Sequence, residues 1–377
     1  MKKKILKLSA NPQIIEWAIK NSGWELNEIL PKIGISKAIY DKWLNLSDKP
    51  TISQLESISN KTKRPLALFF LDKVPVEKPS PKDFRLNPKQ EGKFDKKTIF
   101  AIRRARKLQS ALKEFGENIL GDTIKNLDIG LDNSPQSIAK DLRQKFGLDE
   151  GLQRKMKDSY KLFNFLRSKL EEEKIFNFQI SMPLEDARGF ALSDDIPRVI
   201  VVNSGDIIEA RIFTLIHELG HALLENTEVS IPNFKDTNKI EKWCNEFASS
   251  FLLPQDIARR IFEENKNNLI DYDTLKKLSR KYKLSKSMLL YNMVKLNFIA
   301  PEVYEEILSK CIKKESPEKK KSSGGGVSAE KRCLSEFGAS FVSIVADNID
   351  KKTITYSDAL DYLSIKSRSF EKLINRL

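Results

Sequence analysis

The sequence predicts a multidomain α+β protein, and three observations support this fold class. Short helical segments with turn and capping residues fill the first 73 residues. In the middle of the chain, amphipathic helices and three strand-like runs precede a further helix, and helical segments return after a glycine run near the end. The predicted parts are an all-α bundle at 1–73, a proline-rich linker at 74–92, an α+β domain at 93–313, a flexible linker at 314–327 and a small helical domain at 328–377.

The first 73 residues contain the patterns of five short helices. Gly23 and Gly34 end the first two, and Ser36 can cap the third, "SKAIYDKWLN". Two more follow within "TISQLESISNKTKRPLALFFLD". This segment resembles a helix-turn-helix domain of the Cro/repressor type, because a glycine-containing turn, "GIS", precedes the third of five helices and Trp43 and "KPT" follow.

If this domain binds double-stranded DNA, its third helix would enter the major groove. The residues expected to contact DNA are Ser36, Lys37, Tyr40 and Lys42. Two features favour the alternative, a helical module that binds protein, for example the substrate itself. Leu30 occupies a position where such motifs need a small residue, and Pro31 removes a backbone donor inside the second helix.

The central region begins with amphipathic helical patterns after the linker "VPVEKPSPKDFRLNPKQEG". Three strand candidates follow, namely "IFNFQISM", "RGFALSD" and "RVIVVNS". A further helix comes directly after the last of them. This order of helices, a small sheet and another helix predicts a compact α+β domain.

Both histidines of the chain lie four residues apart, as His217 and His221 in "TLIHELGHALLENTEVS". Side chains at positions i and i+4 share one face of a helix, so the two imidazoles can converge on one ion. Glu218 between them completes the pattern H-E-x-x-H, in which a carboxylate can take a proton from metal-bound water. The alternative is a pair of core histidines, but both composition and spacing match zinc hydrolase chemistry.

Zinc needs a third protein ligand and an open position. Since Leu224 and Thr227 stand where metzincins have glycine and a third histidine, that class is excluded. Glu241 in "NKIEKWCNEFASSFLLP" is the preferred ligand, which makes the site a zincin site of the gluzincin type, and Asn245 one turn later can accept a hydrogen bond from a ligating imidazole. The competing ligands are Glu225, Cys244 and Glu246.

These motifs together resemble the ImmA/IrrE-type metallopeptidases. The resemblance lies in "FTLIHELGHALL", in "GFALSDD" and "PRVIVVNS" before it, in "EKWCNEFASSFLLP" after it, and in "PKDFR" within the linker. It implies that His217, His221 and Glu241 bind Zn²⁺ and that Glu218 is the general base. Cys244 replaces the usual alanine of the family. The family implies a protease that cleaves a repressor or an antitoxin, often on mobile elements or in stress responses.

Composition sets further limits on function. The formal net charge of +14 is compatible with nucleic-acid binding but does not establish it, because lysine abounds throughout the chain. Three cysteines without paired spacing indicate free thiols in a reducing compartment. The chain has no apolar signal-peptide core and no run of 18 apolar residues, so we expect a cytoplasmic protein with no membrane partner.

The last fifty residues end in a helix–turn–helix pattern, "TYSDALDYLSIKSRSFEKLINRL". Three roles are open for this segment: a second helix-turn-helix, a tail that covers the cleft, or a small helical appendage packed on the peptidase. Two functions follow for the whole chain. The preferred one is a zinc endopeptidase that acts on a helix-turn-helix repressor or antitoxin. The alternative is a DNA-binding transcriptional regulator or antitoxin whose peptidase domain is vestigial or a scaffold.

Overall fold

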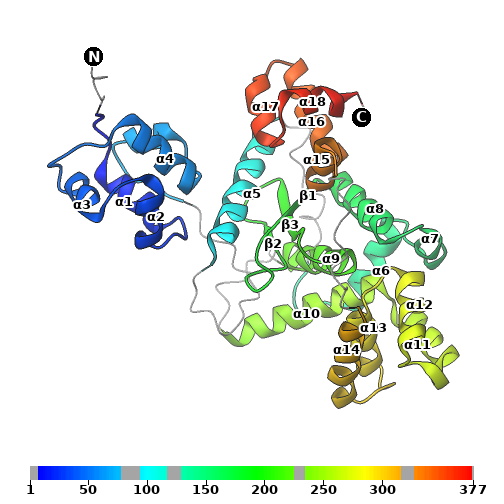
Figure 1. Ribbon diagram of the computed structural model, residues 1–377. Coiled ribbons are helices and arrows are strands. Elements are labelled where there is room, and N and C mark those ends of the chain that lie inside the picture. Colours follow the sequence, from blue (N-terminus) through cyan, green and yellow to red (C-terminus); the bar gives the residue numbers. More distant parts are fainter. Residues whose placement is uncertain (1–6, 78–93, 117–128, 225–233, 316–326, 376–377) are drawn as a thin grey trace. The chain divides into compact units, whose positions relative to one another are not determined.

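The computed structural model describes residues 7–77, 94–116, 129–224, 234–315 and 327–375 (Figure 1). The chain divides into two units, one of which comprises Met1–Arg104 and Glu185–Ala187, and the other Ala105–Leu184 and Arg188–Leu377. The predicted linkers lie mostly outside the described residues, and the "PKDFR" segment lies wholly outside them.

Helices of the N-terminal unit begin and end at residues that satisfy free backbone groups. The Asn11 side chain accepts a hydrogen bond from the amide of Gln13, and Thr51 and Gln54 form a reciprocal capping box. Gly34 adopts the left-handed conformation, with φ of 81°, and so ends one helix and turns the chain into the next. The elements are α1 (Pro12–Lys20), α2 (Leu26–Ile33), α3 (Lys37–Leu44), α4 (Ile52–Thr62) and the 3-10 helix η1 (Leu66–Phe70).

The five helical segments predicted here are present, and they enclose an apolar core of their own. Its largest members are Ile14, Ile29, Tyr40, Trp43 and Phe69. Leu30 is also buried in this core, and α2 continues past Pro31 to Ile33.

The second unit contains a small mixed sheet surrounded by helices (Figure 1). Its strands are β1 (Ile175–Ile180), β2 (Gly189–Leu192) and β3 (Arg198–Asn203). Its helices are α5 (Lys96–Glu114, of which the first nine residues belong to the N-terminal unit), α6 (Pro135–Lys145), α7 (Glu150–Lys155), α8 (Ser159–Glu172), α9 (Ile208–Leu224), α10 (Phe234–Leu252), α11 (Gln255–Glu264), the 3-10 helix η2 (Lys266–Asn268), α12 (Tyr272–Tyr282), α13 (Lys286–Lys295), α14 (Pro301–Glu315), α15 (Ala329–Phe337), α16 (Ala339–Asp350), α17 (Tyr356–Tyr362) and α18 (Ser367–Ile374).

The three predicted strands form one sheet in the order β1-β3-β2. β1 pairs with β3 in parallel, and β2 pairs with β3 in antiparallel register, with Gly189 opposite Val202. All six residues of β3 are buried, as expected for a central strand covered on both faces. Helices α8 and α9 pack on this sheet, and α10 packs across α9 and α6, so α9 lies at the centre of the unit.

The C-terminal helices pack against the same sheet. The Phe178 ring of β1 meets the rings of Phe337 and Phe341 edge to face, with centroids 6.0 and 5.1 Å apart. Arg167 of α8 donates to the carbonyl oxygen of Ser335 at 3.0 Å. Helices α15 and α16 thus pack on the sheet, and the three roles predicted for the final helix–turn–helix pattern stay predictions.

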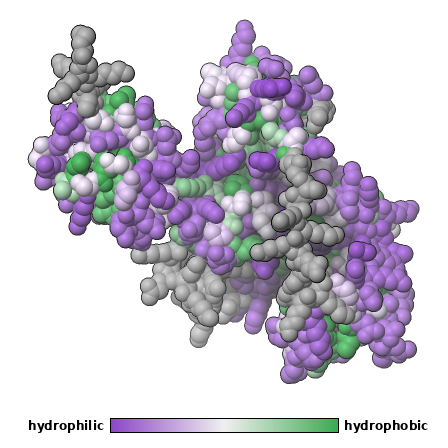
Figure 2. All heavy atoms as spheres, viewed as in Figure 1, coloured by the Kyte–Doolittle hydropathy of each residue, from purple (hydrophilic) through white to green (hydrophobic). Residues whose placement is uncertain are grey.

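Most of the surface visible in Figure 2 is hydrophilic, which agrees with the 31% of charged residues in the sequence. Hydrophobic areas on this face are small and scattered. None of the described helices is long and apolar enough to cross a membrane.

Candidate metal centre

The helix α9 carries both histidines and is buried over its second half. Ile212, Leu215, Ile216, Leu219 and Leu223 recur at helical spacing and belong to the main apolar core. From Thr214 onward every residue of α9 is buried. The two imidazoles are therefore held inside the protein, where bulk water cannot supply hydrogen bonds to their ring nitrogens.

The structure brings His217, His221 and Glu241 together. The Nε2 atoms of the two histidines are 3.1 Å apart. Glu241 Oε2 lies 3.4 Å from His217 Nε2, and Glu241 Oε1 lies 3.2 Å from His221 Nε2. Two imidazole nitrogens and one carboxylate thus form a triangle of possible ligand atoms.

The size of this triangle fits zinc. Ligand atoms about 2.0 to 2.1 Å from a tetrahedral ion are about 3.3 Å from one another. The 3.1 Å between the two imidazole nitrogens agrees with that spacing, and each nitrogen lies 3.2 to 3.4 Å from one of the two Glu241 oxygens. A set of two imidazoles and one carboxylate also leaves a fourth position for water or substrate, as in catalytic zinc sites.

A close crossing of α9 and α10 positions Glu241. A β-carbon added to Gly220 would lie 3.1 Å from Cys244 Sγ and 3.3 Å from Cys244 Cα. Only glycine lets the two helices approach this closely without displacement. Trp243, Phe247 and Phe251 of α10 are buried in the same apolar core as Cys244 and hold the helix in place.

The neighbouring side chains of the cluster shift the pKa values of Glu241 and His221. Burial alone would raise the pKa of Glu241, but hydrogen bonds with His217 and His221 outweigh it and hold the pKa well below its usual range. Burial alone would lower the pKa of His221, yet hydrogen bonds with Cys244 and Glu241 raise the pKa well above the ordinary value. The carboxylate is therefore ionised and available as a ligand at neutral pH.

Cys244 is a neighbour of the cluster to which the sequence reasoning gave no function beyond that of a rival ligand. Its side chain is fully buried and forms a hydrogen bond with His221. The signal was present in the sequence, because Cys244 follows Glu241 by three residues and therefore shares its side of α10. Asn245 is half-buried on the same helix, and its predicted hydrogen bond to an imidazole stays a prediction.

Glu246 has other partners. It accepts hydrogen bonds from Gln136 Nε2 at 2.6 Å and from Ser250 Oγ at 3.3 Å, and it pairs with Lys295. These contacts bind Glu246 to α6 and α13, so it does not join the histidines. Glu225 lies outside the described residues.

Glu218 lies between the two histidines on α9 and is 3% exposed. Its carboxylate is not part of the ligand triangle, which leaves it available as a base. The stem of the side chain lies against Gly189 at the start of β2, where an added β-carbon would stand 3.4 Å from Glu218 Cγ. Packing between the edge strand and α9 thus limits the positions that Glu218 can take.

The predicted DNA-contact residues lie on and beside α3. The Ser36 side chain caps this helix by accepting from the amide of Ile39. Lys37 and Lys42 are exposed. Tyr40, however, is buried in the domain core with 4% exposure, because it shares the inner face of α3 with Trp43, so the expectation that its side chain reaches DNA is wrong for this conformation.

Comparison with known families agrees with this geometry. Residues 170–294 match the peptidase M78 family model, the IrrE N-terminal-like domain. The match spans the sheet, α9 with both histidines and α10 with Glu241. It indicates a metallopeptidase-like role for this part of the chain, in line with the predicted resemblance. No curated protein matches the sequence significantly.

Proposed function

We propose that this chain is a zinc-dependent endopeptidase that cleaves a specific regulatory protein, a repressor or an antitoxin, in a stress-response, mobile-element or toxin–antitoxin setting. The observation that carries the proposal is the triangle of His217, His221 and Glu241 with Glu218 beside it. The match to the peptidase M78 family supports the same chemistry.

His217, His221 and Glu241 would hold the ion. Bound zinc supplies Lewis acidity, which polarises a peptide carbonyl and makes water acidic enough to lose a proton near neutral pH. Glu218 then accepts the proton of the attacking water. It can pass that proton to the leaving amine, since a buried carboxylate beside the site can act as base and then as acid.

The proposal is tested with full-length wild type and Glu218→Gln. Zinc content, measured by elemental analysis after reconstitution, should be about one ion per chain in both proteins. Cleavage of the partner should fall by about 100-fold or more in the variant, because general base catalysis contributes that much. Absence of bound zinc in the wild type at neutral pH would refute the proposal.

The second candidate is a DNA-binding regulator in which the peptidase region is only a scaffold. The exposed Lys37 and Lys42 on α3, after the left-handed turn at Gly34, favour DNA binding by the N-terminal unit. The complete ligand set and Glu218 favour the enzyme, because a scaffold needs neither. The two activities are also compatible in one chain.

A further inference from the structure

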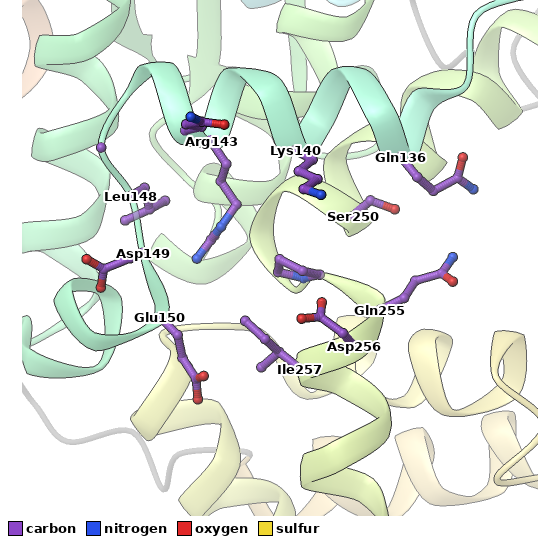
Figure 3. A pocket seen from close by; sticks show the side chains of 13 residues that line it. Gln136, Lys140, Arg143, Leu148, Asp149, Glu150, Ser250, Gln255, Asp256 and Ile257 are labelled. Carbon is purple, nitrogen blue, oxygen red and sulfur yellow. The ribbon is translucent and has the colours of Figure 1, made fainter.

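A cavity lies in the same unit as the candidate metal centre, at the C-terminal end of α10 (Figure 3). Its volume is about 620 Å³, within the range of small-molecule sites. It is formed by one side of α6, by the turn between α6 and α7, and by the end of α10 with the start of α11. The residues that the argument uses are Arg143, Leu148, Asp149, Glu150, Asp256 and Ile257.

Arg143 is an unusual member of this cavity, because it is 94% buried. Its Nη1 donates to the carbonyl oxygen of Phe251 at 2.7 Å. Its Nη2 is also buried but has no hydrogen-bond partner among the described residues. Figure 3 shows the side chain running from α6 into the space between the α6–α7 turn and the start of α11.

This guanidinium stays charged. Burial lowers the pKa of Arg143 to about 10, against the opposing effect of the carboxylates of Asp149, Asp256 and Glu150. These carboxylates offset the charge of the cation, but none of them accepts a hydrogen bond from Nη2, and a buried donor without an acceptor is costly. An anionic ligand group would satisfy Nη2.

The start of α11 adds further donors beside Arg143. Pro254 precedes this ten-residue helix and provides no side-chain cap. The first amides of a helix have no partner within it, and those of Gln255, Asp256 and Ile257 donate to no acceptor in the described part of the chain. Together with Arg143 they form a place for one carboxylate.

The three acidic residues of the cavity disfavour a polyanion, although Lys140 lines it as well as Arg143. Glu150 is already paired, since it accepts from Tyr282 Oη at 2.9 Å and from Arg260 Nη2 at 2.6 Å. Asp256 is exposed and has no hydrogen bond or ion pair with the residues that the structure describes. A positive group on the ligand would meet the exposed carboxylate of Asp256, while Leu148 and Ile257 offer apolar contact.

We propose that this cavity binds a small zwitterion, with its carboxylate on Arg143 and the α11 amides and its ammonium group toward Asp256. A free aliphatic amino acid and a short peptide both carry these groups. The site goes beyond the proposed peptidase activity. The cavity and the candidate metal centre both use α10. Ser250, which lines the cavity, follows Glu241 by nine residues, or about 13 Å along the helix.

The test is calorimetric titration of the full-length protein with L-leucine, tri-leucine, L-leucine amide and sodium phosphate. We expect saturable binding of L-leucine, tri-leucine or both, and binding of L-leucine amide weakened by about tenfold or more, since a charge-assisted bond is lost. Leucine alone would identify the free amino acid as the ligand, and tri-leucine alone would identify a peptide; either supports the site.

Arg143→Lys keeps the charge and a donor for Phe251 but removes Nη2, and Asp256→Asn removes the opposite charge on an exposed side chain. Each should weaken binding about tenfold. The controls are Arg259→Lys and Asp141→Asn, at exposed residues of α11 and α6 outside the cavity, and these should leave binding unchanged. If Arg143→Lys fails to fold, Asp256→Asn decides. Absence of saturable binding of both leucine ligands, binding unaffected by the folded cavity variants, or phosphate binding that Asp256→Asn strengthens would overturn the proposal.

Discussion

Gly189 of the edge strand β2 lies directly against Glu218 of α9, so that a β-carbon at Gly189 would stand 3.4 Å from Glu218 Cγ. The same atom would meet Thr214 Cγ2 at 2.5 Å and the carbonyl oxygen of Val201 at 2.7 Å. Real β-carbons do not approach other atoms this closely. The absence of a side chain at Gly189 therefore sets the distance between the sheet and the helix that carries the candidate base.

Gly189→Ala should lower the free energy of unfolding by about 1 to 3 kcal/mol, because a methyl group is forced into a packed interior. Urea denaturation followed by circular dichroism measures this change. Adding Thr214→Ser should recover part of the loss, since it removes the methyl group that is closest. Gly151→Ala is the control, because its new β-carbon would meet only the side-chain Oδ1 of Asp149 at 3.1 Å. Equal stability of Gly189→Ala and wild type would contradict this packing.

Zinc retention should depend on Glu241 and not on Glu246. Glu241→Ala removes one of three ligand atoms, so the dissociation constant for zinc should rise by more than about 100-fold. Glu246→Ala is a matched control on the same helix, because its partners are Gln136, Ser250 and Lys295. Competition with a chromogenic chelator gives both constants. A larger effect of Glu246→Ala would show that the third ligand is misassigned.

The pH dependence of stability should include a contribution from Glu150. Burial raises the pKa of Glu150, but hydrogen bonds from Arg260 and Tyr282 outweigh it, and the net pKa lies below the usual 4.5. A depressed pKa in the folded state stabilises the protein above the unfolded-state pKa, and this stability is lost as the pH falls through the folded-state value.

Glu150→Gln should therefore lower the free energy of unfolding at pH 7 by less than about 1 kcal/mol, because the pair is near the surface. The difference from wild type should shrink below about pH 4. Urea denaturation at pH 7, 5 and 3.5 measures it, with the exposed Glu302→Gln as control. A difference that grows toward acidic pH would have the wrong sign for this assignment.

DNA binding by the N-terminal unit should be salt-dependent, because neutralised phosphates release counterions. Lys37→Ala on α3 should change the preferred sequence, whereas Lys63→Ala, exposed at the end of α4, should weaken binding to all sequences and reduce the salt slope by about 1. Fluorescence anisotropy with labelled duplexes at several salt concentrations distinguishes the two effects. Undetectable or salt-insensitive binding would favour a protein-docking role.

Much of the candidate metal centre could be predicted from sequence because it depends on local periodicity. The spacing of His217 and His221 implies one helix face, and Glu241 is the acid on the next apolar helix. The hydrogen bond between Cys244 and His221 depends on how closely α9 and α10 cross. Gly220 permits this close crossing, but its contact with Cys244 is seen only in the folded structure. Residue types were predictable here, but distances were not.

In the N-terminal unit, too, local features were predictable from the sequence and features that depend on packing were not. Its helix ends followed from residues such as Gly34 and Ser36, whose preferences are local. Tyr40 was assigned to DNA although its three-residue spacing from Trp43 places both on the inner face of α3. Arg143 could not be foreseen as buried, because its hydrogen-bond partner, the carbonyl oxygen of Phe251, lies more than a hundred residues away in the sequence.

The full-length protein should cut one partner and spare generic substrates. Unrestricted cleavage by an open zinc peptidase would damage the cell, and the N-terminal helical unit and the C-terminal helices offer surfaces through which a partner could be selected. We therefore expect nearly no cleavage of casein and efficient cleavage of a helix-turn-helix repressor or antitoxin encoded beside this gene. Electrophoresis and mass spectrometry of the products measure both.

The control is Glu218→Gln, which should still bind zinc and the partner but leave the partner intact, since Glu218 acts on water and is not a ligand. Co-purification of this variant with the uncut partner would separate recognition from chemistry. Rapid casein digestion by the wild type would remove the need for docking through the flanking helices. Partner cleavage that persists in Glu218→Gln would show that another group takes the proton, and the assignment of Glu218 as the base would be wrong.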